Sequence, residues 1–223
     1  CSVMAQKTIR DANAVERKIT SFHAIQIQNG IDLYLSQGND EAVAVSASQT
    51  EYRNKIVTVV ENGILKIYYE HKESMNIQWG NKKMKAYVSF KTLDNLRASG
   101  GADVFADEGI NSNQLAMSLS GGSDFHGKIN CSNAKMEASG GSDIYVSGKA
   151  ATLRISASGG SDVDAYGLIT DNCDIDASGG SDVNITANKE LNVNASGGSD
   201  VHYKGNATLK KISSSSSDVK KVG

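Results

Sequence analysis

The stretch Ala157-Ser158-Gly159-Gly160-Ser161-Asp162-Val163 holds one copy of the motif that decides the fold of this 223-residue chain. Ser-Gly-Gly-Ser-Asp occurs five times, with Ser-Gly-Gly-Ala-Asp before the series and a degraded Ser-Ser-Ser-Ser-Asp after it. The spacings between successive Asp residues are 21, 19, 19, 20, 18 and 18. A period that tolerates such small insertions is typical of the coils of a solenoid. The seven copies end at Asp103, Asp124, Asp143, Asp162, Asp182, Asp200 and Asp218.

Apolar and polar residues alternate on both sides of each motif. Counted from the Asp, positions −7, −5 and +1 are apolar in nearly every copy, and the residues between them are polar. Alternation with period two on both sides of a Gly-Gly turn predicts two strands per coil, each with one face turned inward. The glycines supply a positive φ at the corner. Around Asp162 the inward residues would be Ile155, Ala157 and Val163.

The repeats therefore predict an all-β fold, a single-stranded parallel β-helix with coils of about 19 residues. Three parts are expected: an N-terminal tail over residues 1–18, a more irregular β region over 19–97, and the regular β-helix with its C-terminal cap over 98–223. Within the irregular region, Asn62-Gly63 predicts a hairpin and residues 84–90 predict a strand. Residues 7–18 are polar and predict a short helix or a loose tail.

Motifs of the N-terminal part match a known family. The run Phe22-x-x-Ile25-x-Ile27-x-Asn29-Gly30-Ile31-Asp32-Leu33-x-Leu35-x-x-Gly38, the later Glu61-Asn-Gly-Ile-Leu-Lys-Ile67 and the approach to the repeats over 93–101 carry the match. Over residues 18–215 the chain resembles the bacterial "head GIN domain" family, described as auto-transporter adhesins. The resemblance implies a right-handed β-helix in an exported protein, often from Bacteroides-like bacteria. The family name spells Gly-Ile-Asn, whereas this chain has Gly30-Ile31-Asp32. The resemblance implies no catalytic residues.

Composition excludes several classes of protein. Proline is absent, as expected of a chain whose backbone amides are nearly all committed to strand pairing. The net charge of −2 gives no reason to expect nucleic acid as a partner. The three cysteines lack metal-ligand spacing, and Cys131 and Cys173 are predicted to be small core residues. Cys1 is either the lipidated cysteine of a mature lipoprotein or a remnant of a signal peptide, and both readings predict export.

The Asp column is the sharpest repeated feature. In a β-helix, Asp103, Asp124, Asp143, Asp162, Asp182 and Asp200 would stack about 4.8 Å apart. Adjacent carboxylates at this distance repel one another, so each one needs a compensating partner. We expect local hydrogen bonds from the Gly-Gly-Ser backbone or from serine hydroxyls. A calcium column is the alternative, although the motif lacks the second glycine of the Gly-Gly-x-Gly-x-Asp rolls.

Position +2 offers the only local cluster of rings. Phe105, His126 and Tyr145 occupy it on three successive coils and are predicted to face outward. The rings form either a ladder that stabilises the sheet or a binding surface for a sugar or a partner protein. Because the Asp residues recur in every coil and the rings do not, a ligand is expected at the rings.

The sequence thus predicts an exported binding or adhesion module of the periplasm, outer membrane or cell surface, with no catalytic activity and no cofactor. A carbohydrate or a surface protein is the expected partner, and a membrane is reached only through a lipid on Cys1. One alternative is a purely structural envelope protein. Another is a β-helical polysaccharide-active enzyme, disfavoured because the carboxylates follow the repeat instead of interrupting it.

Overall fold

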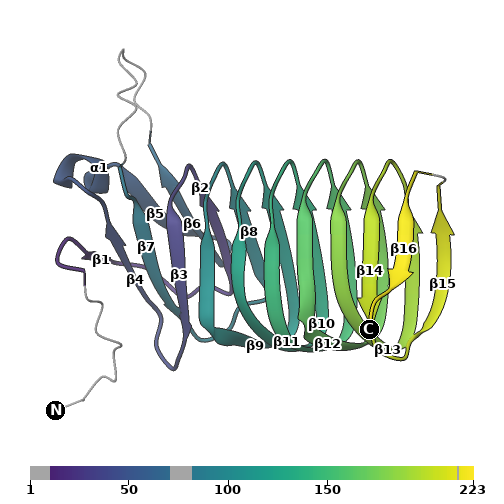
Figure 1. The fold of residues 1–223 in the computed structure, drawn as a ribbon. Helices are drawn as coiled ribbons and strands as arrows, with labels where there is room; N and C mark the ends of the chain where they lie inside the picture. The colour runs from purple at the N-terminus through teal and green to yellow at the C-terminus, as the bar shows by residue number, and fades with distance from the viewer. Residues whose placement is uncertain (1–10, 71–81, 215) are drawn as a thin grey trace.

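The fold is a parallel β-solenoid, seen side-on in Figure 1 of a computed structural model that describes residues 11–70, 82–214 and 216–223. The irregular N-terminal part lies at one end and the regular coils follow it to the C-terminus. The N-terminal elements are β1 (Val15–Arg17), β2 (Ala24–Gln28), β3 (Asp32–Gln37), β4 (Ala42–Ser46), α1 (Thr50–Asn54), β5 (Ile56–Glu61), β6 (Ile64–Tyr69), β7 (Lys85–Phe90) and β8 (Asn95–Ser99). The coils are β9 (Val104–Ser120), β10 (Phe125–Ser139), β11 (Ile144–Ser158), β12 (Asp162–Ser178), β13 (Asp182–Ala195), β14 (Asp200–Lys204), β15 (Thr208–Ser213) and β16 (Asp218–Lys221).

Successive coils pair in parallel and in the predicted register. Asp162 lies opposite Asp182, which lies opposite Asp200, and the rings of position +2 are also neighbours. The two strands expected in each coil are joined into one long strand, such as β10, because backbone pairing continues through the bend opposite the Gly-Gly corner. The predicted parallel β-helix with coils of about 19 residues is confirmed. Its handedness stays a prediction.

The core consists of the residues predicted to point inward. Ile155, Ala157 and Val163 are each at most 1% exposed, and their equivalents in the other coils are also buried. No single coil encloses these side chains, so they lose contact with water only when coils stack. The buried cluster runs without interruption from Phe22 in the N-terminal part to Val219 near the C-terminus.

The corners hold two features in one place. Both glycines of every Gly-Gly pair have positive φ, as predicted, with φ of 73° at Gly159 and 85° at Gly160. The serine that follows every pair but the first, where Ala102 takes its place, turns its hydroxyl into the core and is fully buried. Ser161 Oγ lies 3.0 Å from the carbonyl oxygen of Ala138 in the previous coil and 2.9 Å from that of Ser158, and it accepts the N–H of Ser158. The hydroxyl therefore adds buried hydrogen bonds to the backbone at each such corner.

The N-terminal end is closed by antiparallel strands. β4 pairs antiparallel with β7 on one side and with β1 on the other, so the parallel stack ends there. Of the segment 7–18, expected as a helix or a loose tail, residues 7–10 lie outside the described residues, and residues 15–17 form strand β1 instead. The predicted hairpin at Asn62-Gly63 is confirmed, with β5 and β6 antiparallel and both turn residues at positive φ. The predicted strand over 84–90 is β7. The short helix α1 was not predicted.

The C-terminal end is a half-formed coil. β15 continues the stack on β13, and β16 continues it on β14. Lys211 lies in register with the buried Val193 but is itself exposed, so the inward apolar column ends at this coil. Lysines here place charge beside unpaired strand edges, a feature that discourages further strand addition.

Candidate functional site

The three predicted residues of position +2 lie side by side in the structure. The ring centroids of Phe105 and His126 are 5.6 Å apart, and those of His126 and Tyr145 are 4.8 Å apart, with planes within 10° of parallel. Two further rings extend the stack toward the N-terminus. Tyr34 lies 5.0 Å from Phe105, and Tyr87 lies 5.3 Å from Tyr34. We call the five residues Tyr87, Tyr34, Phe105, His126 and Tyr145 the aromatic ladder.

The ladder determines which ring surfaces a ligand can reach. The centroid separations are close to the spacing of neighbouring strands, so the rings stack along the solenoid axis. Each inner ring therefore has another ring on both faces and offers only its edge to solvent. Tyr145 differs, because the next coil places Asp164 beside it instead of a ring. Tyr145 is 42% exposed, whereas Phe105 and His126 are half-buried.

Sequence reasoning missed Tyr34 and Tyr87. Tyr34 follows Asp32 by two residues in the diverged repeat, so the register contained a signal for it. Tyr87 had no such signal. It joins the ladder because β7 pairs in parallel with β3 and sets Lys85 opposite Asp32 and Tyr87 opposite Tyr34. The Tyr87 hydroxyl donates to Asp11 at 2.9 Å. Burial and this hydrogen bond raise the Tyr87 pKa, so the phenol stays protonated and anchors this end of the ladder.

The Asp column lies beside the ladder, and its hydrogen-bond donors differ from those expected. Asp124 Oδ1 accepts the backbone N–H of Asp143 at 3.0 Å, and Asp143 Oδ1 accepts that of Asp162 at 3.0 Å. The same contact links Asp162 to Asp182 at 3.3 Å and Asp200 to Asp218 at 3.2 Å. The donor is thus the amide of the equivalent Asp in the next coil. The expected Gly-Gly-Ser and serine donors are wrong, because the serine hydroxyls turn into the core.

Electrostatic repulsion persists within the column. Burial, followed by the charge of Asp124, raises the pKa of the Asp103 carboxyl. Burial likewise raises the pKa of Asp162, with Asp143 and Asp182 adding to the effect. Asp32 belongs to the same row, and burial and then Asp103 raise its pKa. The hydrogen bonds from the amides of the next coil offset part of the electrostatic repulsion between the carboxylates, since a hydrogen bond to a carboxylate favours its charged form.

Metal binding and thiol chemistry have little support. Within the described residues, no three His, Cys, Asp or Glu side chains are grouped so as to hold a metal ion. Cys173 is buried, as predicted, and burial raises its thiol pKa. Cys131 is only partly buried against the core. Both are free thiols. Cys1 lies outside the described residues. No helix in the described part of the chain is long and apolar enough to cross a bilayer.

The sequence and the fold were compared with known proteins. A family model described as "Putative auto-transporter adhesin, head GIN domain" matches residues 21–207. No curated protein matches the chain.

Solved structures from Bacteroides and Parabacteroides species have the same fold. A "putative adhesin" from Bacteroides fragilis NCTC 9343 superposes with a TM-score of 0.82 at 17% identity, covering 94% of this chain and 96% of that one. A "putative adhesin" from Parabacteroides merdae ATCC 43184 gives 0.73 at 16% identity, covering 94% and 95%. A "putative lipid binding protein" from Parabacteroides distasonis ATCC 8503 gives 0.71 at 20% identity, covering 94% and 96%. At these identities the likeness concerns the fold alone.

Proposed function

Since the chain belongs to the head GIN domain family of adhesin-like proteins, we propose that it is an exported, non-catalytic binding module displayed at the cell surface. The module holds a rigid face toward its ligand, because the coils from β9 to β13 are fixed by strand pairing on both sides. A carbohydrate or a surface protein is the partner. No chemical step is assigned to the Asp column, since it follows the repeat and Asp124 and Asp143 each accept an amide from the next coil.

The observation that carries this proposal is the exposed terminal ring of the ladder. Tyr145 has one face stacked on His126 and the other directed toward Asp164 of the next coil. Its hydroxyl lies 3.4 Å from Asp143 Oδ2. A flat apolar face next to carboxylate acceptors suits a ligand that combines an apolar face with hydrogen-bond donors. The edges of Phe105 and His126 extend this surface over the two preceding coils.

A purely structural role is the second candidate, and the stacking geometry itself favours it. Rings stacked across neighbouring strands stabilise a sheet by about 0.5–1.5 kcal/mol for each pair, so a ladder needs no ligand to be useful. The two roles differ at Tyr145. A structural ladder gains from this ring only its contact with His126, whereas a binding face needs its exposed surface.

The experiment compares binding and stability in the same variants. The wild-type protein is screened on arrays of glycans and of purified surface proteins. Tyr145→Ser and the Phe105→Ser/Tyr145→Ser double variant are then tested on each ligand found. We expect at least about a tenfold loss of affinity with the fold retained, whereas Tyr166→Ser, which removes a half-buried tyrosine outside the ladder, binds normally. Full binding by a folded double variant would eliminate the ladder as the site.

A further inference from the structure

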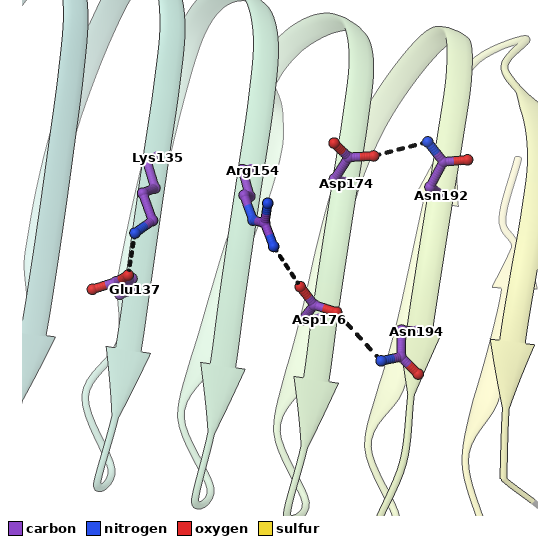
Figure 2. Close-up of polar contacts among 7 residues, drawn as sticks. All are labelled: Lys135, Glu137, Arg154, Asp174, Asp176, Asn192 and Asn194. Carbon is purple, nitrogen blue, oxygen red and sulfur yellow. Dashed lines mark hydrogen bonds and ion pairs between the residues drawn. The ribbon is translucent and has the colours of Figure 1, made fainter.

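A second candidate surface lies on the strand segments that precede the Gly-Gly corners, whereas the ladder lies on the segments that follow them. There residues of four neighbouring strands, most of them with outward side chains, surround a hollow of about 360 Å³. This volume falls within the range of small-ligand sites. Figure 2 shows the polar side chains along β11, β12 and β13. We call this hollow the polar groove, and its lining residues are Arg154, Asp174, Ile175, Asp176, Asn192, Val193, Asn194, Lys210 and Lys211.

Hydrogen bonds between coils hold the groove side chains in place. Asn192 Nδ2 donates to Asp174 Oδ1 at 2.8 Å, and Asn194 Nδ2 donates to Asp176 Oδ1 at 3.3 Å. Arg154 reaches Asp176 Oδ2 from the opposite side at 3.3 Å. Figure 2 shows these contacts running across the strands in two rows. Because each asparagine uses an N–H of its amide toward the preceding coil, its carbonyl oxygen is left to face the groove on the β15 side.

The lining residues carry a net charge of +1, and the ion pair of Lys210 with Glu190, which lies outside the lining, offsets it. Arg154, Lys210 and Lys211 supply three positive charges, and Asp174, Asp176 and the neighbouring Glu190 supply three negative ones. Lys210 Nζ lies 2.8 Å from Glu190 Oε1, and this ion pair lies at the edge of the groove. A polyanion or a polycation gains nothing from a site without net charge. A neutral ligand with many hydrogen-bond groups fits better.

The position of the groove on a sheet face also selects among neutral ligands. A peptide strand binds a sheet through the main-chain groups of an exposed edge. Here β11, β12 and β13 are paired on both sides and β15 is paired with β13, so the face of the groove offers side chains, and only the outer edge of β15 is unpaired. A sugar hydroxyl both donates and accepts, so it matches a surface on which carboxylate and amide acceptors lie between Arg and Lys donors.

The composition of the groove is local and does not follow the repeat. On β10 the two rows hold Lys135 and Glu137, which form an ion pair of 2.5 Å with each other. Only on β12 and β13 do the rows consist of aspartates that are hydrogen-bonded to asparagines. A side-chain ladder that served stability alone would be expected to recur in every coil, as the Asp column does. We infer that the polar groove is a binding site for a neutral oligosaccharide, separate from the aromatic ladder.

The test uses the whole protein and follows the groove amides directly. Side-chain amide signals of Asn192 and Asn194 are assigned in ¹⁵N-labelled protein with single Asn→Asp variants. Cellotetraose, mannotetraose and xylotetraose are the neutral probes, and tetragalacturonate is the charged one. We expect at least one neutral probe to shift both amide signals at concentrations up to about 10 mM, a weak but specific affinity. The Asn192→Ala/Asn194→Ala variant should then bind at least about tenfold more weakly.

Matched controls separate this inference from the proposed role of the ladder. Asn130 donates to Asn111 at 3.2 Å on the surface outside the groove, so Asn130→Ala removes a similar amide contact and should bind normally. Tyr145→Ser should leave binding in the groove unchanged. The inference is overturned if no neutral probe moves the two signals, if only tetragalacturonate does, or if the folded double variant binds as tightly as wild type. None of these outcomes bears on Tyr145.

Discussion

Asp143 Oδ1 accepts the backbone N–H of Asp162 from the next coil at 3.0 Å, and this contact links the repeated carboxylates to the strand ladder. Each Asp therefore has two opposing effects on stability. Its oxygen satisfies an amide, and its charge repels the neighbouring carboxylates. The two effects can be separated by substitution, because asparagine retains an acceptor oxygen and carries no charge.

The first prediction concerns Asp162. Asp162→Ala should destabilise the protein by about 1–2 kcal/mol, because the N–H of Asp182 loses its acceptor. Asp162→Asn should be at least as stable as wild type at neutral pH. Denaturant unfolding of both variants measures the difference.

The pH dependence provides the control for Asp162. Its pKa is raised above 3.8, so the favourable contribution of the protonated form is present below that value and is lost as the pH rises through the folded-state pKa. The advantage of Asp162→Asn over wild type should therefore grow from mild acid to neutral pH. An advantage that is the same at every pH would show that charge in the column does not matter.

The second prediction concerns the corner glycines. Gly160 has φ of 85° and a Cβ there would meet no atom within 4 Å, so Gly160→Val should cost about 1–3 kcal/mol through backbone strain alone. At Gly197 a Cβ would lie 2.9 Å from the backbone nitrogen of Gly179 in the previous coil. Gly197→Ala should thus lower the melting temperature more than Gly160→Ala does. Equal effects would mean that close stacking of the corners is unimportant.

The third prediction concerns the buried serines. Ser161→Ala should destabilise the protein by about 1–3 kcal/mol, because it removes a buried hydroxyl whose hydrogen bonds join Ser158 to Ala138 of the previous coil. Ser156→Ala, on the outward face of β11, serves as the control and should have little effect. Thermal unfolding compares the two. If both variants have the melting temperature of the wild type, the buried serine hydroxyls contribute nothing to stability.

The fourth prediction concerns calcium. One carboxylate oxygen of Asp124 and one of Asp143 already bind amides, and calcium requires six to eight oxygen ligands. Excess EDTA should therefore leave the melting temperature unchanged. A rise of several degrees on adding calcium would contradict this, since a ligand that binds only the folded state stabilises it by mass action.

The regular part of the fold could be predicted because its signal is repeated. The apolar positions around Asp162 recur in each coil, and the stacking register follows from aligning the motifs. The N-terminal end lacks this redundancy. Strand β1 is short and mostly polar, so its pairing with β4 depends on tertiary contacts that no local pattern reveals. The same limit applies to Tyr87, whose place in the ladder depends on which strand lies next to β3.

The candidate sites were predictable only in part. Phe105, His126 and Tyr145 were found because they share one position of the repeat. The direction of their ring faces was not, since it depends on side-chain torsions and not on register. The donors to the Asp column were also missed, because a motif read along the chain suggests partners within its own coil. The polar groove went unnoticed for the same reason, as its two rows run across coils.

The irregularities of pairing are confined to one side of the solenoid. β10 and β11 match without any shift, whereas the interruptions in the other long pairs fall between Gly127 and Ile129, between Tyr145 and Ser147, and after Ala165. All of these lie in the bend away from the Gly-Gly corners. Extra residues can therefore be inserted at that bend without moving a corner out of phase, and a whole 19-residue unit could be removed or duplicated. The number of coils and the length of the bend can therefore change while the Gly-Gly corners stay in register.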